Sequence, residues 1–341
     1  MFYVAEASAF VRDLDLRATE LRSMAWSAST WKTKTSQWKR YLGFCTLASA
    51  TPVPTKLDNL CRYAVFLSKS LKYSTIQNYV SAVISLNSYF GHDCLYLRSE
   101  FTFSMTMSGI RRALGDPEPH RPTLFVSDLH LMYSKLDLSN NDELCMWACV
   151  VLAFRGLLRK SNLVPDSAKL QGHFLRRGAI VFTEWGLEVR VSSSKTIQYG
   201  QKVHRVPVTF SAGSPLCAVT WLKRHFSDVP NYDPDCPAFL LSGSGSPKPL
   251  TYGKLLAFLK TLLVRAGLDS ARVGCHSLRR AGALYMYNLG LSLEDIRQCG
   301  DWSSMAALVY LTKPFQSKIS TDSFVSRALS SYASHRMGAH C

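Results

Sequence analysis

Apolar residues recur every three to four positions through the first part of the chain, and this period predicts helices rather than strands. The predicted helices span residues 4–24, 30–48, 56–70, 74–90 and 102–114. Short side chains that carry an oxygen commonly cap the first turn of a helix. The candidate N-caps are Ser29 or Thr30, Thr55 and Ser74. We therefore expect this part of the chain to be entirely helical.

The helix predicted at residues 30–48 carries an aromatic stripe and a set of basic residues. The aromatic positions are Trp31, Trp38, Tyr41 and Phe44, and the basic positions are Lys32, Lys34, Lys39 and Arg40. Aromatic residues at helical spacing favour a core stripe over a base-stacking surface. The basic side chains could contact phosphate groups from the other face of the helix.

A segment of different composition follows, GDPEPHRPT at residues 115–123, with three prolines and one glycine. This composition is typical of a linker between domains. We therefore expect a helical domain at residues 1–116, a linker at residues 117–123 that contains Arg121, and a second domain at residues 124–341.

The second domain mixes the helical period with a strand period. Its predicted helices lie near residues 126–136, 141–155, 214–226, 251–266, 277–289, 292–299 and 303–311. Between them, GAIVFTEW, LEVRVSSS and VHRVPVTF are short, rich in β-branched residues and separated by turn residues. Gly290 is a candidate C-terminal cap of the helix before it. The predicted fold class is therefore mainly α with a small antiparallel β-sheet.

Composition and charge narrow the class of partner. A length of 341 residues favours two domains over one core. With 47% hydrophobic and 19% charged residues, the chain has the composition of a globular protein rather than a disordered one. Its formal net charge of +16 favours a polyanionic partner, most often nucleic acid, with an anionic membrane surface as the lesser alternative.

The sequence has no pattern of a membrane span, a signal peptide or a zinc site. Its longest apolar run, residues 144–158, is interrupted by Arg155 and too short to cross a bilayer, so we expect a buried core helix there. The first fifteen residues lack the features of a signal peptide, which argues against secretion. Ten cysteines are scattered without a CxxC pair, which favours reduced thiols over disulfides or metal ligands.

The residues that could carry chemistry are those that cleavage of a phosphodiester requires in the absence of a metal. The reaction needs cations for the non-bridging oxygens, an acid for the leaving oxygen and a nucleophile in line with it. Arginine suits the first task, lysine or histidine the second and tyrosine the third. The candidates are, in chain order, Arg159, Lys195, His276, Arg279, Trp302 and Tyr310. His276 and Arg279 are three residues apart, so one helix face could direct both at one small anion.

These residues and their order resemble the tyrosine recombinase (integrase) family, over nearly the whole chain. STIQNYVSAVISL is similar to part of that family's helical DNA-binding domain, and GLLRKSNL to the segment with its first arginine. SSSKTIQYGQ resembles the β-hairpin that bears the family lysine, and HSLRR the His-x-x-Arg box. GDWSS resembles the box before the nucleophile, which places Tyr310 at the nucleophile, eight residues after Trp302. The resemblance is closest to eukaryotic mobile-element recombinases of the DIRS, Ngaro and Crypton types.

The chain departs from the family pattern at two positions. Asn162 stands where many members have an acidic residue that orients the first arginine, and Trp302 stands where others have histidine. Trp302 can donate one N–H but cannot transfer a proton. Arg155 competes with Arg159 for the role of first arginine, but the family spacing favours Arg159. A second HxxR, in HFLRR at residues 173–177, lies too close to Arg159 and lacks the later aromatic residues.

The resemblance implies a site-specific recombinase that cuts DNA through a 3′-phosphotyrosine at Tyr310 and needs no ATP, metal or other cofactor. In that reading Arg159 and Arg279 hold the phosphate, and Lys195 protonates the leaving oxygen. His276 helps position or deprotonate Tyr310, and Trp302 packs and hydrogen-bonds at the phosphate. The family also implies a SAM-like core-binding domain and a C-shaped clamp on double-stranded DNA. It further implies a tetramer on two DNA sites, in which residues 318–335 either dock on their own domain or pass to a neighbouring protomer.

A mobile-element origin in a eukaryote would imply a nuclear protein, and otherwise a cytoplasmic one acting on chromosomal DNA. Two other functions stay open. One is an inactive, domesticated DNA-binding protein, an alternative that is left open because Asn162 replaces the acidic residue of many family members. The other is DNA relaxation of the type IB topoisomerase kind, although those enzymes usually have lysine where this chain has His276 and histidine where it has Trp302.

Overall fold

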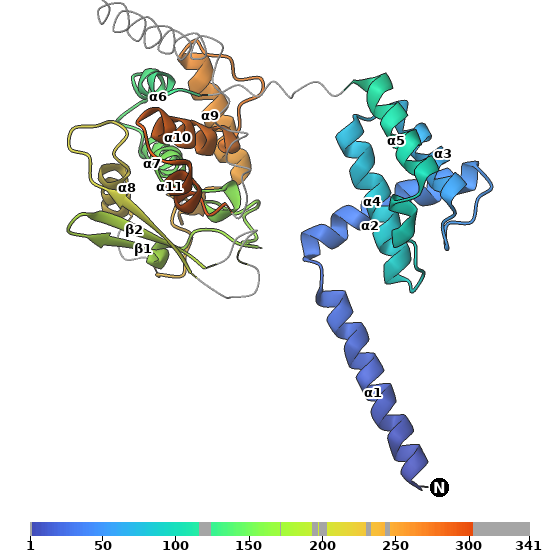
Figure 1. The fold of residues 1–341 in the computed structure, drawn as a ribbon. Coiled ribbons are helices and arrows are strands. Elements are labelled where there is room, and N and C mark those ends of the chain that lie inside the picture. Colours follow the sequence, from blue (N-terminus) through green and yellow to red (C-terminus); the bar gives the residue numbers. More distant parts are fainter. Residues whose placement is uncertain are drawn as a thin grey trace, which may run out of the picture. The chain divides into compact units, whose positions relative to one another are not determined.

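The computed structural model describes residues 2–115 (side chains from residue 10), 124–170, 172–192, 197, 203–229, 233–242 and 246–302 (Figure 1). The chain divides into two compact units, Met1–Pro119 and His120–Cys341. The division falls inside the segment that its composition marks as a linker. Among the described residues, helices dominate both units and strands occur only in the second, so the predicted fold class is confirmed.

The described part of the first unit is helical, as its period predicts. Its elements are α1 (Phe2–Met24), α2 (Ala28–Leu47), α3 (Leu57–Ser68), α4 (Tyr73–Tyr89), α5 (Phe101–Leu114) and the 3-10 turn η1 (Leu95–Arg98). Helix α2 packs against α4 and α3 against α5 around a core that includes Tyr41, Leu60, Tyr63 and Ile76. Tyr41 and Phe44 are buried and Trp38 packs against them, so the aromatic residues of α2 form a core stripe.

The predicted helix caps of this unit are wrong. Ser27, rather than Ser29 or Thr30, caps α2, and its side chain accepts a hydrogen bond from the Thr30 N–H. Thr55 lies before α3 but is buried, with its hydroxyl 2.5 Å from that of Tyr41 and its N–H donating to Asn87 at 2.9 Å. Tertiary hydrogen bonds thus use the groups that a cap would need. Ser74 lies inside α4.

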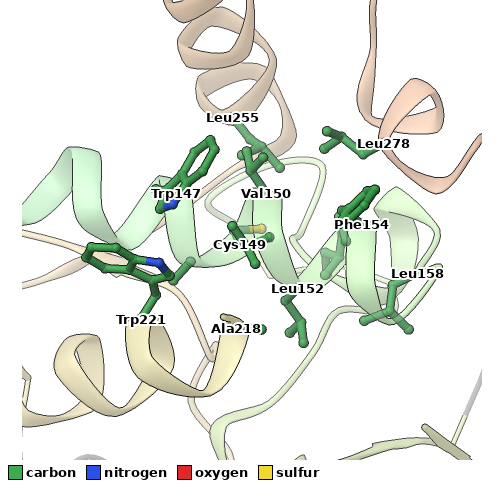
Figure 2. Close-up of a cluster of buried hydrophobic side chains, with 14 of the residues drawn as sticks. Trp147, Cys149, Val150, Leu152, Phe154, Leu158, Ala218, Trp221, Leu255 and Leu278 are labelled. Atoms are coloured by element: carbon green, nitrogen blue, oxygen red, sulfur yellow. The ribbon is translucent and has the colours of Figure 1, made fainter. Parts of the chain in front are cut away.

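The second unit is built around α7 (Asn141–Arg155). Eleven of the fifteen residues of α7 are buried, which confirms the core helix expected within residues 144–158. Asn140 caps its first turn, accepting hydrogen bonds from the N–H groups of Asp142 and Glu143. The surrounding helices are α6 (Val126–Tyr133), α8 (Ala218–Asp228), α9 (Tyr252–Arg265), α10 (Cys275–Asn288) and α11 (Leu293–Cys299). Figure 2 shows side chains of α7 between Trp221 of α8, Leu255 of α9 and Leu278 of α10. No helix of the described residues is long and apolar enough to cross a membrane.

A three-stranded antiparallel sheet lies beside these helices, as the strand pattern predicts. Its strands are β1 (Ile180–Thr183), β2 (Gly186–Val191) and β3 (His204–Thr209), in the order β1-β2-β3. The pairing of Val191 with His204 closes the described part of the β2–β3 hairpin. The sequence did not suggest the short pair β4 (Leu240–Leu241) and β5 (Lys248–Pro249), because two-residue strands carry no period. Positive φ at Gly290, +90°, follows the end of α10, as its expected capping role requires.

A buried histidine, which no sequence pattern predicts, joins α8 to this core. His225 is 3% exposed, its Nε2 lies 3.6 Å from the Cys145 Sγ, and the Leu240 N–H donates to Nε2 at 3.4 Å. Burial lowers the pKa of His225 to about 4, with nearby Arg177 also lowering it and Asp142 and Asp228 opposing the shift. The neutral ring is therefore part of the folded state.

We expect the unfolding free energy to fall as the pH drops from about 6.5 to about 4. In that window the unfolded state binds a proton that folded His225 excludes, at a cost of at most about 1.4 kcal/mol per pH unit. Urea unfolding at several pH values measures the slope. His225→Gln should have a shallower slope, whereas His130→Gln, an exposed control on α6, should keep that of the wild type. Equal slopes for all three proteins would contradict this role of His225.

Candidate active site

Arg159 follows a sharp reversal of the chain at the end of α7. The helix ends at Arg155, and Leu157 adopts a positive φ of 49°, a conformation that is strained for a leucine. Arg159 then precedes the 3-10 turn η2 (Lys160–Asn162). The competing Arg155 points elsewhere, because its guanidinium donates to the carbonyl and hydroxyl oxygens of Thr209 on β3 at 3.4 and 3.5 Å.

Arg279 lies on α10, and its side chain contacts the segment that follows α7. Its side chain is 3% exposed, and its two terminal nitrogens donate to the carbonyl oxygens of Leu157 and Gly300. These hydrogen bonds connect α10 with the end of α7 and with the end of α11. The guanidinium is therefore held in a fixed orientation by backbone atoms from two other segments.

The ring of Trp302 packs against the guanidinium of Arg279. The centre of the Arg279 guanidinium lies 4.0 Å from the centroid of the Trp302 ring, a distance typical of a cation–π contact. Trp302 is buried in a small cluster with Leu157, Ala283 and Ile296. The chain reverses between α11 and Trp302 at Asp301, which has a positive φ of 49°. The hydrogen bond that the sequence suggested from Trp302 to a phosphate stays a prediction.

These segments enclose one small pocket. Arg159 and Arg279 both line it, from parts of the chain that are far apart in the sequence. The full lining is Leu157, Leu158, Arg159, Asn162, Val191, His204, Arg279, Gly300 and Asp301. Two arginines around one opening suit an anion such as a phosphate, because guanidinium groups donate in pairs and remain charged. Asn162, the position that departs from an acidic residue, contributes a neutral side chain to the same lining.

The close approach of α10 to α7 depends on a glycine. A Cβ atom added at Gly282 would overlap the Phe154 carbonyl oxygen and the Leu157 side chain. Gly282 lies three residues after Arg279 on α10, and Leu157 lies two residues before Arg159. The close packing of α10 on the end of α7, next to both arginines, therefore requires a residue without a Cβ atom at this position.

We expect Gly282→Ala to lower the unfolding free energy by about 1–3 kcal/mol, because the extra carbon has no space and α10 must move. Urea unfolding measures the loss. The matched control is Gly253→Ala on α9, where nothing lies within 4 Å of the added Cβ. If Gly282→Ala were as stable as this control, the close packing of α10 on α7 would not constrain the site.

Three of the predicted site residues, Lys195, Tyr310 and Arg121, lie outside the described residues. The described ends of the β2–β3 hairpin, Val191 and His204, line the pocket, and Lys195 belongs to the segment between them. Lys195 follows Val191 by four positions in the sequence. His276 lies in the first turn of α10 with its side chain exposed, and it does not belong to the lining of the pocket.

The second HxxR segment lies in a neighbouring pocket. His173 and Arg176 line a hollow together with Arg190 on β2, and this hollow shares Asn162 and Val191 with the pocket of Arg159 and Arg279. Arg176 is also tied to Asp235, donating to its carbonyl oxygen at 2.7 Å. The second HxxR segment, residues 173–177, is therefore close to the candidate site but does not line its pocket.

The basic residues of α2 separate into two kinds. Lys32 and Lys39 are exposed, whereas Lys34 and Arg40 are half-buried against aromatic rings. The Lys34 ammonium lies 4.4 Å from the centroid of the Trp26 ring, and burial, with a smaller effect of Arg98, lowers its pKa. Arg40 lies over the Tyr79 ring at 5.4 Å and donates to Ser70. Lys34 and Arg40 thus pack on aromatic rings outside the α2 stripe, Trp26 before α2 and Tyr79 on α4.

Among the described residues, no group of three or more histidine, cysteine, aspartate or glutamate side chains is arranged to hold a metal ion. The described cysteines carry free thiols. Burial raises the pKa of Cys275, at the start of α10, to about 11. Its thiol is therefore protonated at neutral pH and packs as an apolar group.

One sequence relative and the structural neighbours of this chain are described as integrases or recombinases. No family model matches the chain. It is 22% identical over 276 residues to an integrase/recombinase xerD homolog of Selenomonas ruminantium, which covers 79% of this chain and 77% of the relative. The structure resembles that of the Tn1549 transposon integrase in complex with transposon right end DNA. The TM-score is 0.59 and the identity 15%, over 91% of this chain and 98% of that one.

A second structural neighbour is a lambda integrase dimer bound to a core site, with a TM-score of 0.54 and 15% identity over 87% of this chain and 93% of that chain. The chain has the tyrosine recombinase fold. The sequence relative is an integrase/recombinase homolog, and both structural neighbours are integrases. In a tyrosine recombinase fold, the pocket between α7, α10 and α11 is the candidate active site.

Sequence reasoning missed one polar residue of the candidate site. His204 lines the pocket of Arg159 and Arg279, yet it belongs to none of the motifs that carry the resemblance. The alternation of apolar and polar residues along β3 could have indicated it, because His204 points to the same face of the strand as Val206 and Val208, both of which are buried.

Proposed function

We propose that the chain is a site-specific tyrosine recombinase that cuts and rejoins DNA strands through a 3′-phosphotyrosine intermediate. The observation that carries the proposal is the pocket in which Arg159 and Arg279 come together within a tyrosine recombinase fold. The net charge of +16 supports a nucleic-acid partner. The solved relatives named above include integrases bound to DNA, which supports the same partner.

In the proposed reaction, the Tyr310 hydroxyl attacks the scissile phosphate and releases a 5′-hydroxyl. Arg159 and Arg279 stabilise the charge that develops on the non-bridging oxygens. Lys195, on the β2–β3 hairpin, protonates the leaving oxygen, and His276 assists the deprotonation of Tyr310. Because the phosphotyrosine conserves the bond, attack by another 5′-hydroxyl completes strand exchange without ATP or a metal.

We infer that the two domains bind double-stranded DNA as a clamp, with Lys32, Lys39 and Arg121 among the phosphate contacts. Lys34 and Arg40 belong to the same proposed surface, although their stacking on aromatic rings leaves them less free to reach a phosphate. Four protomers would assemble on two DNA sites, with residues 318–335 docked in cis or passed to a neighbour. The transposon integrase among the neighbours supports a mobile-element origin, and for a eukaryotic element of the DIRS, Ngaro or Crypton type the protein would act in the nucleus.

The decisive experiment needs no knowledge of the target site. The protein is incubated in EDTA with a library of nicked random-sequence duplexes, so that a short 5′-hydroxyl fragment diffuses away and traps the covalent adduct. We expect a denaturant-stable protein–DNA adduct, and mass spectrometry of its peptides should locate the DNA on Tyr310. The trapped sequences would reveal the preferred site.

Other results would support the alternatives. DNA binding without an adduct, on assembled paired sites as well as single ones, would favour an inactive DNA-binding protein. An adduct without sequence preference, together with relaxation of supercoiled DNA, would favour a type IB topoisomerase activity. An adduct on a residue other than Tyr310 would overturn the assignment of the nucleophile.

A further inference from the structure

The pocket of Arg159 and Arg279 contains a basic side chain that the family resemblance does not account for. His204 is the first residue of β3 and pairs with Val191, the last residue of β2. Both residues line the pocket. His204 therefore stands at the described base of the β2–β3 hairpin, and it shares the pocket lining with the two arginines.

The direction of His204 follows from the alternation of the strand. Val206 and Val208 are buried in the core, and His204, which is half-buried, has the same parity. The intervening Arg205 points to the other face, where its guanidinium pairs with Glu188 on β2. The position of His204 in the pocket is thus a consequence of the register of β2 and β3, and a one-residue shift would exchange it for Arg205.

We propose that His204 contacts the scissile phosphate and that its ring N–H donates a hydrogen bond to a non-bridging oxygen. The inference rests on the proposed recombinase function. In the cleavage step the Tyr310 hydroxyl gives up its proton with the help of His276 and its oxygen bonds to phosphorus. The bond to the 5′-oxygen breaks and Lys195 protonates that oxygen, while His204 keeps its proton. The charged groups that share the pocket with His204 are Arg159, Arg279 and Asp301.

The surroundings of Trp302 strengthen this assignment. At the position where other family members have histidine, Trp302 packs behind Arg279, and it does not belong to the lining of the pocket. Among the described residues that line the pocket, His204 has the one imidazole. His204 is thus a ring N–H donor on the sheet side of this pocket, beside the N–H that Trp302 is predicted to offer.

The test is single-turnover cleavage of a nicked duplex at saturating protein. His204→Ala should slow adduct formation about 10- to 100-fold, the effect of losing a hydrogen bond to a charged group. His204→Gln, which keeps an N–H donor, should lose less. The matched control is Arg205→Ala, the adjacent residue on the opposite face of the strand, which should cleave as the wild type does. Thermal unfolding of each variant checks that the sheet is intact.

A second substrate separates contact with the phosphate from a structural role. With a methylphosphonate at the scissile position, one diastereomer lacks the oxygen that His204 contacts, and the ratio of wild-type to His204→Ala rates should fall to near unity. The same ratio on both diastereomers and on phosphate would overturn the proposal, as would an unimpaired His204→Ala on phosphate. If the wild type forms no adduct on any substrate, the recombinase function itself fails, and the role of His204 fails with it.

Discussion

Replacing Tyr310 with phenylalanine should abolish the covalent protein–DNA adduct and leave DNA affinity unchanged. The substitution removes one oxygen atom, and without that oxygen no bond to phosphorus can form. The aromatic ring and the net charge of the protein remain, so the basic surface that attracts DNA is unaltered. Denaturing gels of trapped complexes measure the adduct, and fluorescence anisotropy of a labelled duplex measures the affinity.

The control for this variant is Tyr285→Phe. Tyr285 lies on α10, partly exposed, with its ring 5.9 Å from that of Phe154, and phenylalanine keeps this ring contact. It should form adduct at the wild-type rate. Residual adduct with Tyr310→Phe would remove Tyr310 from its role and direct attention to another nucleophile. Loss of DNA binding together with the adduct would show instead that Tyr310 supports the fold or assembly of the protein.

The helices were predictable because their apolar period is sustained over many residues. Residues 141–155 were predicted as a helix with the bounds that α7 has, since an acidic first turn and a long apolar run mark both its position and its burial. The N-terminal caps of the first unit were not predictable, because a threonine such as Thr55 can serve either a helix or a tertiary hydrogen bond, and only the packing of Tyr41 and Asn87 decides. Local pattern thus indicates the elements better than their ends.

Two residues of the candidate pocket could be named from the sequence, but their arrangement could not. Arg159 and Arg279 could be named from motif order, and the structure brings them to one pocket. What holds them there could not be read from the sequence: a positive φ at Leu157, a glycine against the Phe154 carbonyl and a tryptophan behind Arg279. These features depend on contacts between distant segments. His204 was not predicted because its place in the pocket depends on the register of β2 and β3 rather than on a motif.

Arg279→Ala should slow DNA cleavage by about 100- to 1,000-fold, or roughly 3–4 kcal/mol of transition-state stabilisation, as loss of a fixed charge donor does in other active sites. The structure explains why the loss should be large. The guanidinium is held by two backbone carbonyl oxygens and by the face of Trp302, so it need not be reorganised when charge develops on the phosphate. Single-turnover rates on the trapped substrate at saturating protein measure the effect.

Arg279→Lys separates charge from geometry. Lysine keeps the positive charge but has no planar group to stack on Trp302 or to donate to the Leu157 and Gly300 carbonyl oxygens together. We therefore expect Arg279→Lys to remain strongly impaired. Arg155→Ala is the control, because Arg155 ends α7 near the site but bonds to Thr209 and does not line the pocket. Near-normal cleavage by Arg279→Lys would show that a diffuse positive charge suffices, and near-normal cleavage by Arg279→Ala would exclude Arg279 from the reaction. Unfolding measurements on both variants are needed, since loss of the carbonyl contacts also weakens the joint between α7, α10 and α11.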